Sequence, residues 1–204
     1  MPRVKIPRKS TAIDMTAMCD VAFLLLTFFI LTAKPKVEDP VPVDTPRSAT
    51  EVTLPESGVA LITVGKGKTF LTLDGPEMRK QTLLQIGSKY NIGFTPNEVK
   101  QFQNLDAIGV PVQSLKQFLA LDGEQRKAFL ASKNGGIPTD SVSNEMFNWI
   151  REARVVEKNI SGKELRFSIK GDSNEEYPTM ERLIAILQKQ KVNKFSLITS
   201  LRAK

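Results

Sequence analysis

The sequence predicts a single transmembrane helix followed by a small α+β domain that carries a helix-rich insertion. Three observations lead to this fold class. An apolar run of 22 residues, Ala12 to Ala33, contains only two charged side chains. A proline-rich stretch follows it, and the last third of the chain alternates between strand-like and helix-like patterns. The alternation predicts a mixed sheet with two main helices.

The composition excludes several classes of function. Of the 204 residues, 25% are charged, and the net charge is +7. Beyond residue 33 the basic and acidic side chains are interspersed without a basic stripe, so nucleic acid is not an expected partner. Histidine is absent and Cys19 is the only cysteine, which argues against imidazole chemistry, an intrachain disulfide and most zinc sites. With no nucleophile–base pair either, we expect neither an enzyme nor a cofactor or metal.

The run at 12–33 is predicted to cross a membrane. As a helix it would extend about 33 Å, close to the thickness of a bilayer core. Its central part, Phe23 to Leu31, lacks the polar face of a globular core helix. A cleavable signal peptide is the main alternative. However, the run is long, and the bulky residues 28–31 occupy the place of the small residues that mark cleavage.

The charges on either side of the run set its orientation. The basic residues before it are Arg3, Lys5, Arg8 and Lys9, and those soon after it are Lys34 and Lys36. The positive-inside rule then makes residues 1–11 a cytoplasmic tail. The rest of the chain would lie outside, which in a bacterium with two membranes means a single-pass inner-membrane protein with a periplasmic domain.

The two acids of the run have different explanations. Thr11 and Asp14 fit a capping arrangement at the helix start, where Asp14 also meets the positive end of the helix dipole. Asp20 lies past any free backbone amide, and a charge at mid-membrane costs about 2.5–3.5 kcal/mol. Intramembrane acids mark ion or proton routes, so we expect Asp20 to lie on such a route. The alternative is an acid that serves assembly alone, by snorkelling or by pairing with a partner's lysine.

The stripe around Asp20 contains two hydroxyl groups. Thr16, Leu24, Thr27 and Leu31 fall within about 40° of Asp20 on a helical wheel. The hydroxyls of Thr16 and Thr27 could hold the carboxyl group or order a water. Alternatively, each threonine bonds back to its own helix. A lone helix cannot enclose a path, so partner helices are required.

Residues 34–58 hold five of the twelve prolines and are predicted to be an extended linker.

Residues 59–73 are predicted to form a hairpin around the turn "GKGK". That turn resembles part of a phosphate-binding loop. However, the motif needs a glycine where Ile62 stands, and a strand is expected to follow, so nucleotide binding is not expected.

The segment 76–139 is helix-rich and is expected to interrupt the α+β domain, which comprises 59–75 and 140–204. "TPNEVKQF" predicts a capping box with Thr95 as N-cap and Glu98 closing it. A further helix is predicted from Val112, with core residues Leu115, Phe118 and Leu119, up to "LDG".

In the last third, a helix is predicted from its apolar residues Val142, Met146, Trp149, Ile150 and Ala153. A strand at 164–170, a helix opening at Pro178 with core residues Leu183, Ile184 and Leu187, and a strand at 194–200 complete the pattern.

Three stretches resemble the ExbD/TolR family of bacterial inner-membrane proteins. "IDMTAMCDVAFLLLTFFILT" (13–32) is similar to the family's membrane helix, and the resemblance places Asp20 on its proton-carrying aspartate and Thr16 on its nearby threonine. "VPVDTP" (41–46) resembles an extended motif just beyond the membrane, with Thr45 in place of the usual leucine. "IKGDSNEEYPTMERLIAIL" (169–187) resembles a strand–loop–helix unit that includes Asp172 and Tyr177. The resemblance suggests a periplasmic docking role for Val41, Val43, Asp44 and Pro46.

The resemblance also implies partners and a mechanism. In the family, two such helices sit inside a pentamer of an ExbB-like or TolQ-like protein, the periplasmic domain dimerises, and proton flow drives rotation that acts on TonB. The leading hypothesis is therefore a motor subunit that energises TonB-dependent import. The alternatives are a TolR-like subunit that binds peptidoglycan in a Tol-Pal-type system, and a passive membrane-anchored binding protein. The resemblance assigns no role to 76–139.

Overall fold

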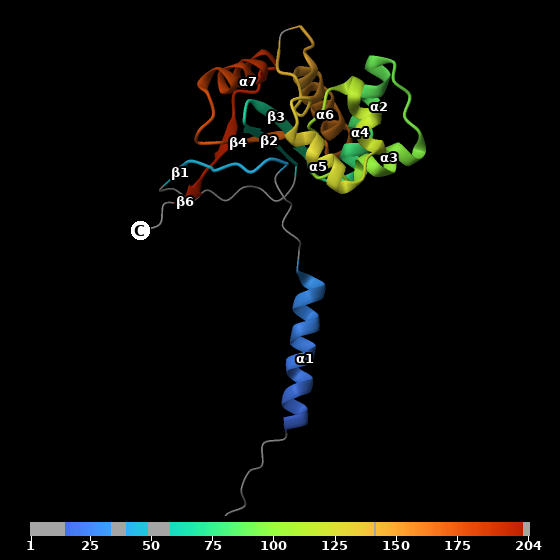
Figure 1. Ribbon diagram of the computed structural model, residues 1–204, viewed down its shortest axis with the longest axis vertical. Helices are drawn as coiled ribbons and strands as arrows, with labels where there is room; N and C mark the ends of the chain where they lie inside the picture. The colour runs from blue at the N-terminus through green and yellow to red at the C-terminus, as the bar shows by residue number, and fades with distance from the viewer. Residues whose placement is uncertain (1–14, 34–39, 49–57, 141, 202–204) are drawn as a thin grey trace, which may run out of the picture. The chain divides into compact units, whose positions relative to one another are not determined.

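The structure is a computed structural model that describes residues 15–33, 40–48, 58–140 and 142–201. The chain divides into two compact units, 1–37 and 38–204, and the second is called the C-terminal domain below. The first unit contains the helix α1, Met15–Thr32 (Figure 1). The helix predicted at 12–33 is present, although its first three residues lie outside the described part.

The C-terminal domain is built on a four-stranded mixed sheet in the order β3-β2-β4-β5. Its strands are β2 (Val59–Gly65), β3 (Lys68–Leu73), β4 (Arg166–Gly171) and β5 (Phe195–Ile198). β2 pairs antiparallel with β3, whereas β4 pairs parallel with both β2 and β5. The hairpin predicted at 59–73 is confirmed. Lys66 and Gly67 both have positive φ angles, 54° and 72°, as a two-residue type I′ turn requires.

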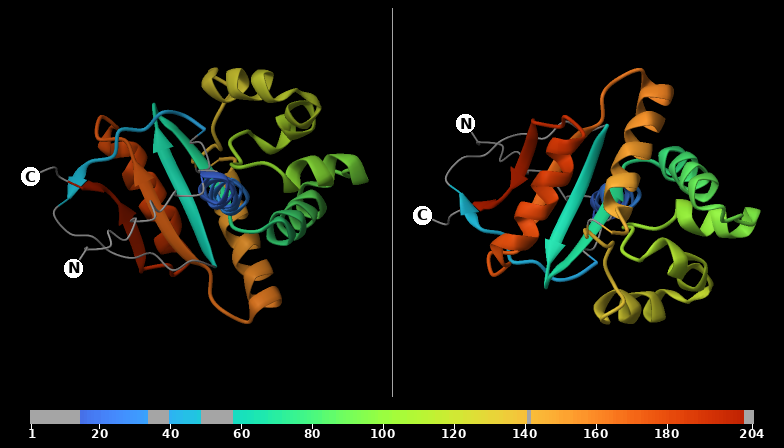
Figure 2. Two further views of the ribbon diagram at one scale, coloured as in Figure 1. Left: turned by 90° about the horizontal axis from the view of Figure 1, so that it is seen from below. Right: turned by 90° about the horizontal axis from the view of Figure 1, so that it is seen from above.

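Two main helices provide the connections between the parallel strands. They are α6 (Glu145–Ser161) and α7 (Tyr177–Lys189), and both lie on the same side of the sheet (Figure 2). This is the arrangement that right-handed crossovers produce. The strand predicted at 194–200 is interrupted at Thr199. Beyond it, β6 (Ser200–Leu201) pairs in parallel with the short β1 (Arg47–Ser48).

The helix-rich segment lies along the edge of the sheet that β3 forms. Its elements are α2 (Pro76–Tyr90), α3 (Pro96–Gln103), the 3₁₀ turn η1 (Val112–Ser114), α4 (Leu115–Ala120) and α5 (Gly123–Ala131). Leu71 and Ile108 exchange two backbone hydrogen bonds of 2.8 and 2.7 Å, and the Ile137 amide donates to the Thr69 carbonyl at 2.8 Å. The inserted segment thereby satisfies backbone groups that an edge strand would leave open.

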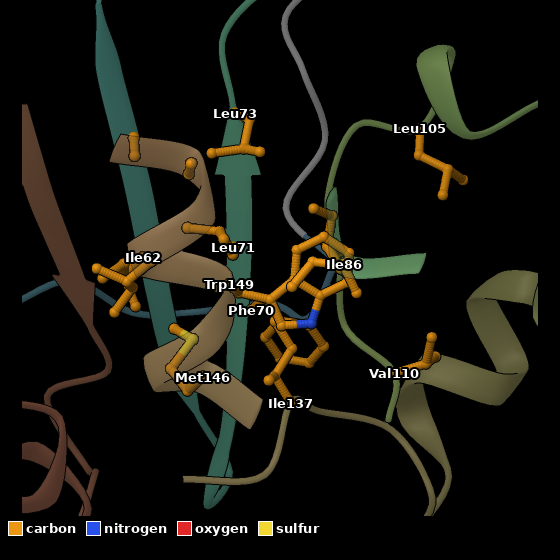
Figure 3. Close-up of a cluster of buried hydrophobic side chains, with 14 of the residues drawn as sticks. Ile62, Phe70, Leu71, Leu73, Ile86, Leu105, Val110, Ile137, Met146 and Trp149 are labelled. Atoms are coloured by element: carbon orange, nitrogen blue, oxygen red, sulfur yellow. The ribbon is translucent and has the colours of Figure 1, made fainter. Parts of the chain in front are cut away.

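One hydrophobic core joins the sheet, the two main helices and the inserted segment. Figure 3 shows the part of this core where α6, the strands β2 and β3 and the inserted segment meet. Trp149 of α6 is fully buried and stacks on Phe102 of α3, with ring centroids 6.0 Å apart. Gly109 lies against Phe70 so closely that a Cβ atom there would overlap the phenylalanine ring. The inserted segment therefore contributes to the same core as the α+β elements.

Two predictions of helix starts have different outcomes. The capping box of α3 is confirmed: the Glu98 amide donates to the Thr95 hydroxyl at 3.3 Å, and the Thr95 amide donates to the Glu98 carboxylate at 2.7 Å. Val142 was expected on the buried face of α6, but this expectation is wrong. The helix begins only at Glu145, because Asn144 has a left-handed backbone with φ 48°, and Val142 is 92% exposed.

The remaining helix predictions agree closely with the structure. The helix predicted from Val112 begins as the 3₁₀ turn η1 and continues as α4, which ends at Ala120, so "LDG" ends it as expected. A further helix, α5, follows at Gly123. Pro178 lies in the first turn of α7, where its missing N–H costs no helical hydrogen bond. Leu183 and Leu187 are fully buried, while Ile184 is only partly buried beside them.

Candidate functional site

The helix α1 has the length and composition of a membrane span. Its 18 residues extend about 27 Å, and none of its side chains is buried within the chain. Among the described residues it is the one helix long and apolar enough to cross a membrane. In hydrocarbon, a helix satisfies its own backbone groups internally, so such a sequence is stable there as a helix.

Asp20 is the sixth residue of α1, one turn and a half from its described start. The free backbone amides of a helix belong to its first four residues, so none is available to this carboxylate. No hydrogen bond or ion pair joins the Asp20 side chain to another residue within the described part of the chain. A carboxyl group on an apolar helix therefore depends on partners outside this chain, or on water, for its polar contacts.

Thr27 makes the bond to its own helix that was one of the two possibilities for its hydroxyl group. Its hydroxyl donates to the Leu24 carbonyl of the same helix at 2.9 Å, which is the back-bonded alternative. The hydroxyl proton is therefore not available to Asp20, although the oxygen keeps its capacity to accept. Thr16 keeps its predicted place on the stripe, one turn before Asp20. Thr11 and Asp14, the predicted N-cap pair, lie outside the described residues.

The predicted docking residues lie within the C-terminal domain and contact other parts of it. Val41 is only 4% exposed and belongs to the core. The Cγ2 atom of Val43 lies 3.0 Å from the position that a Cβ on Gly65 would occupy. The Asp44 carbonyl accepts a hydrogen bond of 2.8 Å from the Ser173 amide. Pro46, the fourth of these residues, is partly buried.

The loop after β4 lies at the same end of the sheet. The Asp172 amide donates to the Val64 carbonyl at 3.0 Å, and the Asp172 carboxylate accepts from the Asn174 amide at 3.1 Å. Both carboxylate oxygens of Glu175 lie 3.1 Å from the amide nitrogen of Gly67, in the hairpin turn. Tyr177 is 73% exposed at the start of α7. The stretches 41–46 and 169–187, far apart in sequence, thus meet at one end of the sheet.

Two charged side chains of the C-terminal domain have contacts that sequence reasoning did not identify. Glu145 is 6% exposed, and its carboxylate accepts a hydrogen bond of 2.9 Å from the Val112 amide. Burial raises the pKa of this carboxyl group.

Lys68 donates to the carbonyls of Leu130, Ala131 and Ser132, the last residues of α5 and its cap. Burial lowers the pKa of Lys68, with a smaller contribution from the Lys66 charge. Neither contact has a local sequence signal, because each joins residues more than 30 positions apart.

A hollow on the C-terminal domain lies between the hairpin turn and residues 133–139. The amides of Gly135, Gly136 and Ile137 line it, but each already donates to a carbonyl. The Lys68 ammonium is likewise occupied by carbonyls. Within the described ranges, no three histidine, cysteine, aspartate or glutamate side chains gather as a metal site would require. The acid on α1 is therefore the strongest candidate for function.

A family model described as Biopolymer transport protein ExbD/TolR matches residues 7–202. The chain belongs to the ExbD/TolR family. The match includes both α1 and nearly all of the C-terminal domain, and the fold is a single candidate membrane helix with a small α+β domain, as the sequence predicted. No curated protein and no solved structure is similar enough to match.

Membership of the ExbD/TolR family determines the general class of function. The family consists of non-enzymatic proteins of transport and energy transduction. Its members work with membrane partners of the ExbB or TolQ type. The chain is therefore a biopolymer transport subunit in this general sense, and its one apolar N-terminal helix fits a single-pass membrane protein.

Proposed function

We propose that this ExbD/TolR protein is the proton-driven motor subunit of an ExbB–ExbD-type complex that energises TonB-dependent import across the outer membrane. It would lie in the inner membrane, with its N-terminus in the cytoplasm and its C-terminal domain in the periplasm. The observation that carries the proposal is Asp20. It is a single acid within an exposed apolar helix, and no described residue of the chain satisfies it.

The energetics of this acid suit a device driven by the membrane potential. Keeping a charged acid at mid-membrane costs about 2.5–3.5 kcal/mol, and a potential of 100 mV supplies about 2.3 kcal/mol per charge. Protonated Asp20 would allow its helix to face an apolar wall, whereas ionised Asp20 would require a polar one. Alternate protonation and release of the proton would therefore favour two orientations of α1 in turn. This alternation would couple proton flow to rotation.

The pathway needs other helices around α1. All of its large apolar side chains are more than half exposed, so a ring of partner helices would have to cover them. An ExbB-like pentamer enclosing two copies of α1 would provide such a ring. Thr16, one turn before Asp20, would support the carboxyl group on the N-terminal side. The C-terminal domains of the two copies would pair, and a TonB-like protein would receive the force.

The stretch 41–46 would connect the motor to the C-terminal domain. Val41 is buried in the core and Asp44 bonds to the loop after β4, so a pull on the linker would reach the sheet at this end. We propose that Val41, Val43, Asp44 and Pro46 serve as the docking segment between the linker and the domain. A TonB-like partner would compete for, or add to, the same contacts.

Asp20→Asn tests the proposal directly, because the amide has nearly the same shape but cannot carry a proton. In cells that make the full complex, we expect TonB-dependent uptake of a siderophore or vitamin B12 to fall to the level of the deletion strain. Asp20→Glu should retain part of the uptake, and Asp14→Asn serves as the matched control within the same apolar run. Normal uptake by Asp20→Asn at normal protein levels would show that the acid serves assembly alone.

Deletion of the gene separates the two branches of the family. Loss of siderophore or vitamin B12 uptake with normal resistance to detergent supports the import motor. Detergent sensitivity with normal uptake would instead show the TolR-like role in envelope integrity. Co-purification of the full chain with its membrane partner, followed by identification of that partner as ExbB-like or TolQ-like, provides an independent check.

A further inference from the structure

We infer that Thr27 is a proton-path residue, which holds a water between Asp20 and the C-terminal end of α1 by acting as a hydrogen-bond acceptor only. This inference rests on the proposed function, because it assumes that protons reach Asp20. The sequence alone left two roles open for this hydroxyl, and the structure assigns its proton to the Leu24 carbonyl at 2.9 Å. Because the hydroxyl proton is used in that contact, any further hydrogen bond of Thr27 must be one that its oxygen accepts.

The position of Thr27 supports the inference. It is seven residues after Asp20, which places it about 10 Å further along the axis and within about 20° of the same stripe. From Val21 to Leu31 it is the only residue whose side chain has a hydrogen-bonding atom. Leu24 and Leu31, the other residues of this part of the stripe, offer water no polar contact. A water on this face of α1 beyond Asp20 therefore has one side chain of this helix, Thr27, to bond to.

The chemistry of a back-bonded threonine determines what it can do for that water. A hydroxyl has one proton and two lone pairs, and here the proton is already donated to a carbonyl. The oxygen can then only accept, so a water beside it must point one O–H at Thr27. The second O–H of that water remains available for the next water towards Asp20. At about 2.8 Å for each O–H···O step, roughly three waters would bridge the 10 Å to the carboxylate.

Proton transfer along this chain needs no other reactant. A hydronium at the outer end passes a proton to the water that Thr27 holds, and each water passes a proton on. The last water protonates the Asp20 carboxylate, which becomes neutral. Thr27 neither gains nor loses a proton, and its role is to fix the position and orientation of one water in an otherwise apolar region.

Thr32 provides a matched control within the same helix. Its hydroxyl makes the same kind of back-bond, to the Phe28 carbonyl at 2.7 Å. However, Thr32 lies about 120° from Asp20 around the helix, off the stripe. If back-bonding mattered only for the stability of the helix, replacing either threonine would change the proton flux equally. If Thr27 holds a water on the path, only its replacement would lower the flux.

The test is proton flux through the full complex in liposomes under an imposed potential, normalised to the amount of assembled complex. Thr27→Val keeps the shape and removes the acceptor, and we expect it to lower the flux about three- to tenfold. Thr27→Ser should restore most of the flux, and Thr32→Val should stay within about twofold of the original protein. If Thr27→Val prevents assembly, Thr27→Ala is measured instead, since a smaller side chain cannot clash, and the same loss is expected.

Flux unchanged in Thr27→Val or Thr27→Ala would overturn the inference, as would an equal loss in Thr32→Val. An equal loss in Thr27→Ser would also overturn it, because serine retains the acceptor oxygen. Failure of the proposed function gives a different result. In that case Asp20→Asn would conduct protons as well as the original protein, or neither protein would conduct at all.

Discussion

The helices α1 and α6 are nearly equal in length, with 18 and 17 residues, but they use apolar side chains in opposite ways. In α1 no side chain is buried within the chain, whereas α6 buries seven of its own. Both helices also have acids at notable positions: Asp20 lies on the apolar α1, and α6 buries two acids, Glu145 and Glu157. The Glu145 carboxylate accepts a backbone amide of its own chain, while Asp20 has no such partner among the described residues.

This difference shows where each helix obtains its stability. α6 has one apolar face, and the fold of the C-terminal domain covers it. α1 is apolar on most sides and its own chain buries none of its side chains, as expected of a candidate membrane helix. A buried acid that its own fold satisfies contributes to structure, as Glu145 does. An acid that the described part of the chain leaves unsatisfied is more informative about function, because its polar contacts must come from elsewhere, either from partners or from water.

The largest expected effect compares the same substitution in the two helices. Ile150 in α6 is fully buried, and Ile30 in α1 is 66% exposed. Ile150→Ala should lower the free energy of unfolding of the C-terminal domain by about 2–5 kcal/mol, because it leaves a cavity in the core. Ile30→Ala should leave this free energy unchanged. Denaturant unfolding of the full-length protein in detergent, followed by Trp149 fluorescence, measures both, and similar losses would contradict the comparison.

A smaller effect tests whether the inserted segment belongs to the core of the C-terminal domain. A Cβ atom at Gly109 would overlap Phe70 and crowd Leu130, so Gly109→Ala should destabilise the domain by about 1–3 kcal/mol. Gly93, in the same segment, has open space where its Cβ would lie, and Gly93→Ala is the control. Thermal unfolding of the two variants should differ clearly. Equal melting temperatures would mean that the contact at Gly109 relaxes without cost.

The N-cap of α3 should have a still smaller effect. Thr95→Ala removes the hydroxyl that accepts the Glu98 amide, and this should cost about 1 kcal/mol of stability. Thr95→Ser retains the acceptor and should lose little. The same unfolding assay measures both variants. A loss of equal size in Thr95→Ser would show that the threonine methyl group, and not the cap, stabilises the helix.

The smallest effect concerns pH and the two glutamates whose pKa values shift in opposite directions. Burial raises the pKa of Glu145, so the stability linked to its protonated form is complete below the unfolded pKa and is lost as the pH rises through the folded pKa. The hydrogen bond from the Thr95 backbone lowers the pKa of Glu98, so its contribution is present above the unfolded pKa and is lost as the pH falls through the folded pKa.

Replacement of each glutamate by glutamine separates the two contributions. Glu145→Gln should raise the melting temperature slightly at neutral pH, because the amide oxygen still accepts the Val112 amide and no charge is buried. Glu98→Gln should lower it slightly at the same pH. Melting temperatures measured from about pH 4 to 8, around the usual glutamate pKa, should show the two differences with opposite signs. Changes of the same sign in the two variants would show that another ionisable group controls how the melting temperature depends on pH.

Several features of this protein were determined by its sequence alone. The run at 12–33 could be predicted to be a membrane helix from the sequence, since such a prediction depends only on the length and polarity of the segment. Asp20 interrupts that run, so it could be singled out without coordinates. The hairpin at 59–73 and the capping box at Thr95 were also predicted correctly, because a type I′ turn and an N-cap depend on residues no more than a few positions apart.

Other features depended on the tertiary structure. Val142 fits the helical spacing of α6, but the left-handed backbone of Asn144 places it outside the helix and in solvent. The partner of Glu145 is 33 positions away, and the meeting of 41–46 with the loop after β4 joins residues more than 120 positions apart. Local patterns record helical period, turns and caps, whereas contacts at long range result from the packing of the whole domain. For Thr27 the sequence left open whether the hydroxyl bonds to its own helix, and only the geometry of α1 shows that it donates to the Leu24 carbonyl.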